Sequence, residues 1–159
     1  MPDDSALRQH LIDLLQGGHA HASFDAAVKG FPRDLIGKRP KGGPYSAWEL
    51  LEHMRLAQED ILRFSQSADH CSPKWPEGYW PQSPAPERPA HWAASVKAFR
   101  RDLAEFAEMV KDPAKDLYQT FPWGDGQTLL REAMLIADHN SYHLGQLVLV
   151  RRLLGAWKG

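Results

Sequence analysis

The stretch from Ser46 to His53 reads Ser-Ala-Trp-Glu-Leu-Leu-Glu-His, and it predicts the start of a long helix. Ser46 and Glu49 have the spacing of a capping box, in which the serine hydroxyl accepts from the Glu49 amide and the glutamate carboxylate accepts from the Ser46 amide. Apolar residues then recur at steps of four and three: Leu50, Met54, Ala57, Ile61 and Phe64. We therefore expect a helix from residue 46 to about residue 68 with one buried stripe.

Helical spacing of apolar residues also appears on both sides of this helix. Asp4 or Ser5 is a candidate cap for a first helix, which the glycines at 17–18 end, and a short second segment covers about residues 20–28. Residues 90–111 contain neither Gly nor Pro and predict a third long helix.

The last predicted helix covers residues 129–154, after Thr128 as its candidate cap. Residues 73–89 hold six of the twelve prolines with three large aromatic residues, so we expect a long loop there. Neither an alternating β pattern nor an internal repeat is present in the sequence. The expected fold is all-α, with four helices around one core and long loops, as a single domain over residues 1–159.

Composition excludes several classes of protein. The 159 residues are 43% hydrophobic and carry 19 Lys and Arg against 20 Asp and Glu, so a net charge of -1 provides no basic surface for nucleic acid or an anionic membrane. The longest apolar run, residues 133–137, is far shorter than the roughly 20 residues of a membrane span, and the acidic start is unlike a signal peptide. We expect a cytoplasmic protein. Since Cys71 is the single cysteine, a metal ion would need His or carboxylate ligands.

Histidines on the last predicted helix suggest such a site. At 100° per residue, His139 and His143 lie on the inward face with Ile136 and Leu147, opposite a solvated face that contains Asp138. Residues four apart are one turn apart, so both rings can reach one ion at about 2.0 to 2.1 Å.

His53 lies at the inner edge of the stripe on the helix from residue 46 and can supply a third nitrogen from a facing helix. A shared cation would satisfy three buried imidazoles at once. The alternative is three core histidines that bond Asn140, Gln146 or backbone carbonyls. Asp60 and Glu132 lie seven residues from a proposed ligand, so each is a further ligand, a carboxylate that supports one, or a member of a salt bridge at the helix edge.

The remaining histidines receive no predicted role: His10, His19, His21, His70 and His91. Glu132, Asn140 and Gln146 are weak candidates for catalytic helpers. Position 140 is Asn where an HExxH metalloprotease carries its glutamate base, so peptide hydrolysis of that type is not expected.

The segments from Ser46 to His53 and from Ala137 to Gln146, with Val150 to Gly155 after them, together resemble the DinB-like (YfiT/DinB) superfamily. The resemblance covers nearly the whole chain. It implies an up-and-down four-helix bundle of mirrored handedness, and it carries the family's three metal ligands onto His53, His139 and His143. It also implies Zn or Ni as the ion, frequent homodimers, and reactions that join or move low-molecular-weight thiols.

Three hypotheses for function follow. In the first, three neutral histidines leave a coordination position open for a thiol or water, and the chain is a metal-dependent enzyme, a thiol S-transferase or a hydrolase. In the second, the metal is structural, and the chain is a non-catalytic stress-response or interaction module. In the third, the histidines belong to a metal-free core.

Overall fold

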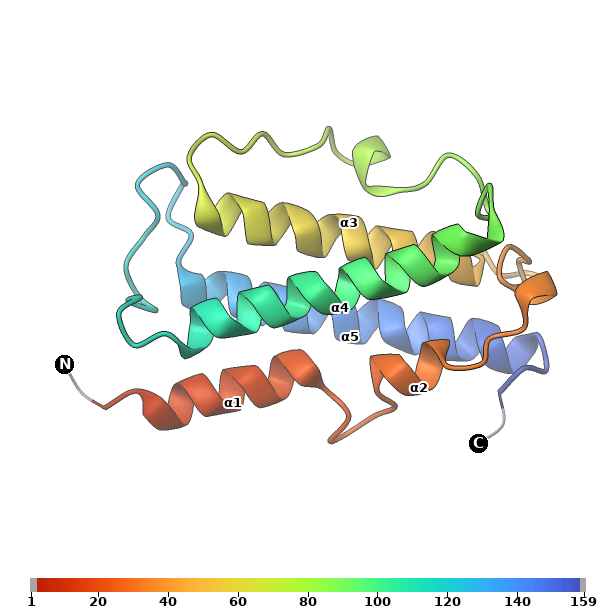
Figure 1. Cartoon of the computed structure of the whole chain (residues 1–159), viewed down its shortest axis with the longest axis horizontal. Coiled ribbons are helices and arrows are strands. Elements are labelled where there is room, and N and C mark those ends of the chain that lie inside the picture. Colours follow the sequence, from red (N-terminus) through yellow and green to blue (C-terminus); the bar gives the residue numbers. More distant parts are fainter. Residues whose placement is uncertain (1–2, 158–159) are drawn as a thin grey trace.

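The computed structural model describes residues 3–157, and this part of the chain is all-α with one isolated antiparallel bridge between Thr120 and Thr128 (Figure 1). Within these residues, no helix is both long enough and apolar enough to span a membrane. The α-helices are α1 (Ser5–Gln16), α2 (Phe24–Val28), α3 (Ala47–Gln66), α4 (Pro89–Lys111) and α5 (Leu129–Leu153). Two short 3-10 helices, η1 (Arg33–Leu35) and η2 (Glu77–Tyr79), lie in the connections.

The helix ends follow the local signals in the sequence. The capping box is confirmed, because the Ser46 hydroxyl accepts from the Glu49 amide at 3.2 Å and the Glu49 carboxylate accepts from the Ser46 amide at 2.8 Å. At α5 only one of these two bonds is present: the Thr128 hydroxyl caps the helix by accepting from the Arg131 amide. The predicted start of the second segment at about residue 20 is wrong, since the Ser23 hydroxyl accepts from the Ala26 amide and thereby begins α2 at Phe24.

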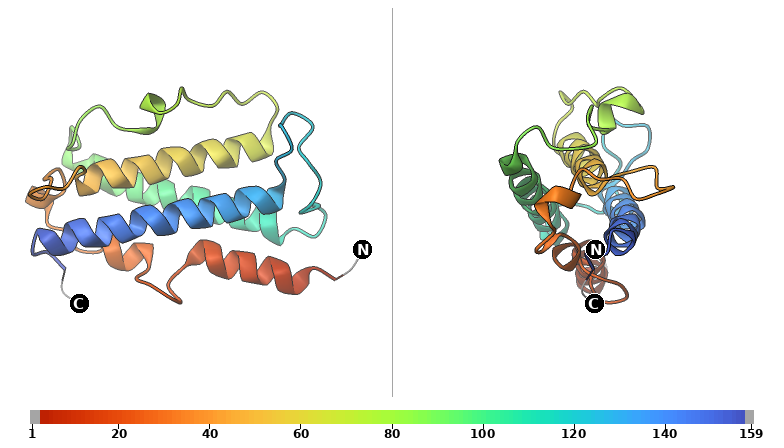
Figure 2. Two further views of the ribbon diagram at one scale, coloured as in Figure 1. Left: turned by 180° about the vertical axis from the view of Figure 1, so that it is seen from behind. Right: turned by 90° about the vertical axis from the view of Figure 1, so that its right-hand side faces the viewer.

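The order of helix directions corrects the up-and-down prediction. Gln58 of α3 bonds Phe99 of α4, and Arg63 further along α3 pairs with Glu105 further along α4, so these consecutive helices run in the same direction. A helix of 20 residues is about 30 Å long, whereas the 22 residues between α3 and α4 can extend roughly 70 Å. The connection is therefore long enough to return along the outer side of α3 before α4 begins (Figures 1 and 2).

Helix α3 is surrounded for its first two turns. Every residue from 46 to 54 is buried, because α4, α5 and the returning connection cover different sides of the helix. Farther along, the buried stripe differs from the predicted one: Leu62 is fully buried, whereas Ile61 and Phe64 are half-buried. Helix α5 runs antiparallel to α3, since His53 faces His143 and Gln58 faces Asn140.

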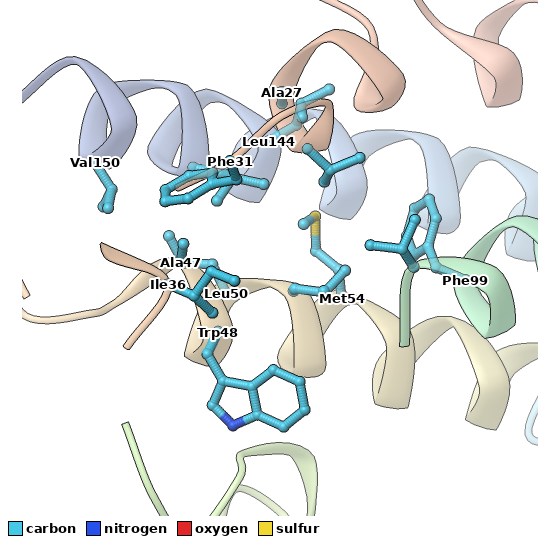
Figure 3. Packing of buried hydrophobic residues seen from close by; sticks show 14 residues of the cluster. Ala27, Phe31, Ile36, Ala47, Trp48, Leu50, Met54, Phe99, Leu144 and Val150 are labelled. Atoms are coloured by element: carbon cyan, nitrogen blue, oxygen red, sulfur yellow. The ribbon is translucent and has the colours of Figure 1, made fainter. Parts of the chain in front are cut away.

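The core consists of two apolar clusters at opposite ends of the helices. One contains Met54 of α3, Phe99 of α4 and Leu144 of α5, and Figure 3 shows Met54 directed toward the other helices while Trp48 points the opposite way. The second cluster contains Leu62 of α3 and Ile136 of α5. Between the two clusters lie polar contacts of α3 with α5, made by His53 and Gln58 on one side and by His139, Asn140 and His143 on the other.

Candidate metal centre

Three histidine side chains meet where α3 crosses α5. His53 Nε2 lies 3.1 Å from His143 Nε2 and 3.0 Å from His139 Nε2. His53 and His143 are only 3% and 8% exposed, and His139 is half-buried. The structure thus brings together all three predicted ligands, including the one from the facing helix.

The second ring nitrogens show which way each imidazole is protonated. His53 Nδ1 lies 2.9 Å from the backbone carbonyl oxygen of Tyr79, which can only accept, so Nδ1 carries the proton. His143 Nδ1 lies 2.7 Å from Gln146 Oε1 and donates to it in the same way. In a neutral ring the other nitrogen then holds a lone pair, and the lone pairs of His53 and His143 face one another at 3.1 Å.

The surroundings keep these rings neutral. Burial lowers the pKa of His53 and of His143 below the ordinary value for imidazole. Burial and the two neighbouring imidazoles lower the pKa of His139 to about 4. Two facing lone pairs repel unless a proton or a cation lies between them, and the lowered pKa values disfavour the proton.

The spacing of the nitrogens suits a metal ion. Ligand nitrogens about 2.0 to 2.1 Å from one ion, at angles between tetrahedral and octahedral, lie about 2.9 to 3.4 Å from each other. The separations of His53 Nε2 from the other two Nε2 atoms, 3.0 and 3.1 Å, fall within this range. Among the described residues, His53, His139 and His143 form the one group of three or more ligand-type side chains whose donor atoms lie close enough together to hold a metal ion, all within 4.8 Å of one another.

Aromatic side chains cover His53 on the side of the returning connection. The Trp80 ring stacks on the His53 ring with centroids 4.0 Å apart and planes 5° apart, and Tyr45 stacks on the far side of Trp80 at 4.5 Å. Tyr142, 64% exposed, meets His143 edge-on. The loop predicted for residues 73–89 thus covers one side of the histidine cluster through Trp80.

Asp60, which lies seven residues after His53 in the sequence, bonds two residues of the connection between α3 and α4. Asp60 accepts from the Tyr79 hydroxyl at 2.7 Å and lies 2.6 Å from His70 Nε2. Burial and the Asp60 charge raise the pKa of Tyr79 to about 12, so this hydroxyl stays protonated. No role was predicted for His70, and its spacing in the sequence gives no signal, because its partner lies ten residues earlier on α3.

The three predicted catalytic helpers, Glu132, Asn140 and Gln146, each bond a protein side chain. Gln146 orients His143, and the Asn140 amide donates to Gln58 at 2.9 Å. Glu132 is buried and bonds Arg131, and its pKa is raised mainly by that burial. Neither Asp60 nor Glu132 joins the converging ligand atoms of the described chain, so the prediction of a further ligand is not supported.

A separate cavity of about 500 Å³ lies between α3, α4 and the segment after Trp80. Its lining includes Trp48, Arg55 and His91 but none of the three converging histidines. Arg55 pairs with both Glu52 and Glu59, so the charge of its guanidinium is compensated within α3.

One comparison with known proteins gives a match. The family described as the DinB superfamily matches residues 16–147, a segment that includes all three converging histidines. The chain therefore belongs to the DinB superfamily. No curated protein and no solved structure matches it. Family membership and the three-histidine cluster are together compatible with metal binding.

Proposed function

We propose that this chain binds one divalent metal ion through the Nε2 atoms of His53, His139 and His143 and acts as a metal-dependent transferase or hydrolase. The observation that carries the proposal is that the Nε2 lone pairs of His53 and His143 face each other. The Nδ1 atoms of these two rings cannot relieve this contact, because they donate to the Tyr79 carbonyl and to Gln146. A cation turns that repulsion into two coordinate bonds.

The family resemblance implies Zn²⁺ or Ni²⁺, which are the ions we propose, and imidazole nitrogens are suitable ligands for both. Three protein ligands leave a coordination position open, as in catalytic zinc sites, and an ion held there would supply Lewis acidity to a substrate group. The chain itself orients the ligands. The Tyr79 carbonyl holds His53, Gln146 holds His143, and the Trp80 ring keeps water from one face of His53.

Further features are proposed from the family resemblance. The four longer helices would form a bundle of mirrored handedness, two copies of the chain would form a homodimer, and a low-molecular-weight thiol would be the substrate. Zn²⁺ and Ni²⁺ accept thiolate ligands, which agrees with the last of these.

Metal analysis of protein purified without a histidine tag tests the ligand assignment. We expect close to one ion per chain in the wild type and loss of tight binding in His143→Ala. His10→Ala, on the exposed surface of α1, is the matched control and should keep the metal. Stoichiometric metal at wild-type affinity in His143→Ala would refute the assignment.

A structural metal is the second candidate, because the three ligands join α3 to α5. Titration of the Co²⁺-loaded protein with a small monothiol distinguishes a catalytic metal site from a structural one. An open position predicts a new sulfur-to-cobalt charge-transfer band, while a closed structural site predicts an unchanged spectrum.

A further inference from the structure

Residues 70–80, which we call the clasp, return from the end of α3 and pass over His53. Their two ends are tied to one carboxylate, since His70 and Tyr79 bond different oxygens of Asp60, at 2.6 and 2.7 Å. Asp60 lies seven residues beyond His53, about 10 Å along the helix axis. It therefore cannot touch the converging nitrogens itself.

Tyr79 links the carboxylate to the centre. Its hydroxyl donates to Asp60, while its own backbone carbonyl accepts from His53 Nδ1 at 2.9 Å. The ring is only 8% exposed, so it lies against the protein rather than in solvent. The next residue, Trp80, stacks on the His53 ring. The two contacts of the clasp with His53 thus come from Tyr79, the residue that Asp60 holds, and from Trp80, the residue after it.

The carbonyl contact decides the tautomer of His53. A backbone oxygen offers lone pairs alone, so it stabilises the ring that carries its proton on Nδ1 and leaves Nε2 free for a ligand bond. Without this contact no acceptor holds the proton of the neutral His53 ring on Nδ1, so the proton distributes between both nitrogens and the fraction with a free Nε2 falls.

We propose that Asp60 is a positioning residue for His53, which acts through the Tyr79 hydroxyl to hold the tautomer and the ring orientation that metal binding needs. The part of this proposal that concerns metal binding rests on the function proposed above. The part that concerns the His53 tautomer is independent of that function, because it applies to the metal-free protein.

The test uses the full chain with two readouts. Long-range proton–nitrogen NMR of the metal-free protein at neutral pH reads the His53 tautomer, and titration with Co²⁺ reads affinity and the visible spectrum. The variants are Asp60→Ala, Asp60→Asn and Tyr79→Phe. Glu105→Gln is the matched control, since it removes a charge that also bonds α3 but lies near Arg63 and Gln66.

Asp60→Ala and Tyr79→Phe should shift His53 toward a mixture of tautomers and weaken Co²⁺ binding by about 10- to 100-fold, the usual effect of removing a group that orients a ligand. Asp60→Asn keeps an acceptor for the Tyr79 hydroxyl and should retain most of the wild-type tautomer. Glu105→Gln should bind within about 2-fold of the wild type. Tyr79→Phe removes one hydroxyl, so it decides the question if Asp60→Ala does not fold.

Wild-type tautomer and affinity in both Asp60→Ala and Tyr79→Phe would overturn the role of Asp60 while leaving the three-histidine proposal intact. Absence of Co²⁺ binding by the wild-type chain would overturn the metal proposal, and the metal-free tautomer comparison would still decide whether Asp60 positions His53.

Discussion

The interface between α3 and α5 is apolar at both ends and polar in the middle. The middle holds an amide pair, Gln58 with Asn140, and the three histidines, and these two groups differ in their hydrogen-bond partners. Gln58 donates to the Phe99 carbonyl and accepts from the Asn140 amide, so both ends of its side chain have protein partners. The Nε2 atoms of His53 and His143 instead lie 3.0 to 3.1 Å from nitrogens of other imidazoles.

Burial without a hydrogen-bond partner costs free energy for an amide and for an imidazole alike, because both lose their bonds to water. Gln58 shows that this interface can supply partners for a buried polar side chain. The histidine layer, one turn away, leaves its lone pairs pointing at one another. This difference is what supports the metal proposal, because a bound cation would satisfy the facing histidine nitrogens, whereas the Gln58 amide already has protein partners.

The largest expected effect lies at an apolar end. Phe106 is fully buried in the cluster with Leu62 and Ile136, and Phe106→Ala should lower the free energy of unfolding by about 4 kcal/mol through lost burial and a cavity. Urea denaturation of metal-free protein measures this. Leu149→Ala, at a side chain 54% exposed on α5, should change it by no more than about 0.5 kcal/mol. A loss below about 1 kcal/mol in Phe106→Ala would mean that this end of the core is not close-packed.

Local signals in the sequence predicted much of this arrangement. The capping box at Ser46 and the cap at Thr128 fixed where α3 and α5 begin, and the helical period showed that His139 and His143 point inward. These features depend on residues within one or two turns of each other. They place each histidine toward the inner side of its helix, whereas the meeting of His53 with His139 and His143, 86 and 90 residues away along the chain, was inferred from the expected packing of four helices and from the family resemblance.

The connections could not be predicted in the same way. Whether α4 runs with or against α3 depends on the path of the residues between them, and no local pattern states that path. The backbone oxygen of Tyr79 carries no signature in the sequence at all, and the bond from His70 to Asp60 exists only because the clasp returns along α3.

Acid should destabilise the histidine layer more than the amide contacts. The pKa of His139 is about 4 in the folded chain against an ordinary value of 6.5, so between these pH values the unfolded chain binds more protons at this site. Stability that is present above pH 6.5 is therefore lost as pH falls toward 4. A pKa shift of this size corresponds to about 3 kcal/mol of unfolding free energy. Because the His139 ring is partly exposed, we expect a loss of about 2 kcal/mol.

His139→Leu isolates this contribution from that of the carboxylates. In chelator, the unfolding free energy of the variant should fall less than that of the wild type between neutral pH and pH 4, by the same margin of about 2 kcal/mol. Met134→Leu, an exposed position on the same helix, serves as control and should keep the wild-type pH dependence. Parallel curves for the wild type and His139→Leu would contradict the burial of a neutral imidazole.

The smallest effect is expected at Gln58, and it tests whether the amide pair is purely structural. Gln58→Leu removes the acceptor of the Asn140 amide and should lower the free energy of unfolding by about 1 to 2 kcal/mol. Adding Asn140→Leu removes the group left without a partner, so the double variant should be more stable than the sum of the two single losses predicts, by about 1 kcal/mol. Additive losses would show that Gln58 and Asn140 do not stabilise each other. The contrast with the histidine layer would then rest on the bond from Gln58 to Phe99 alone.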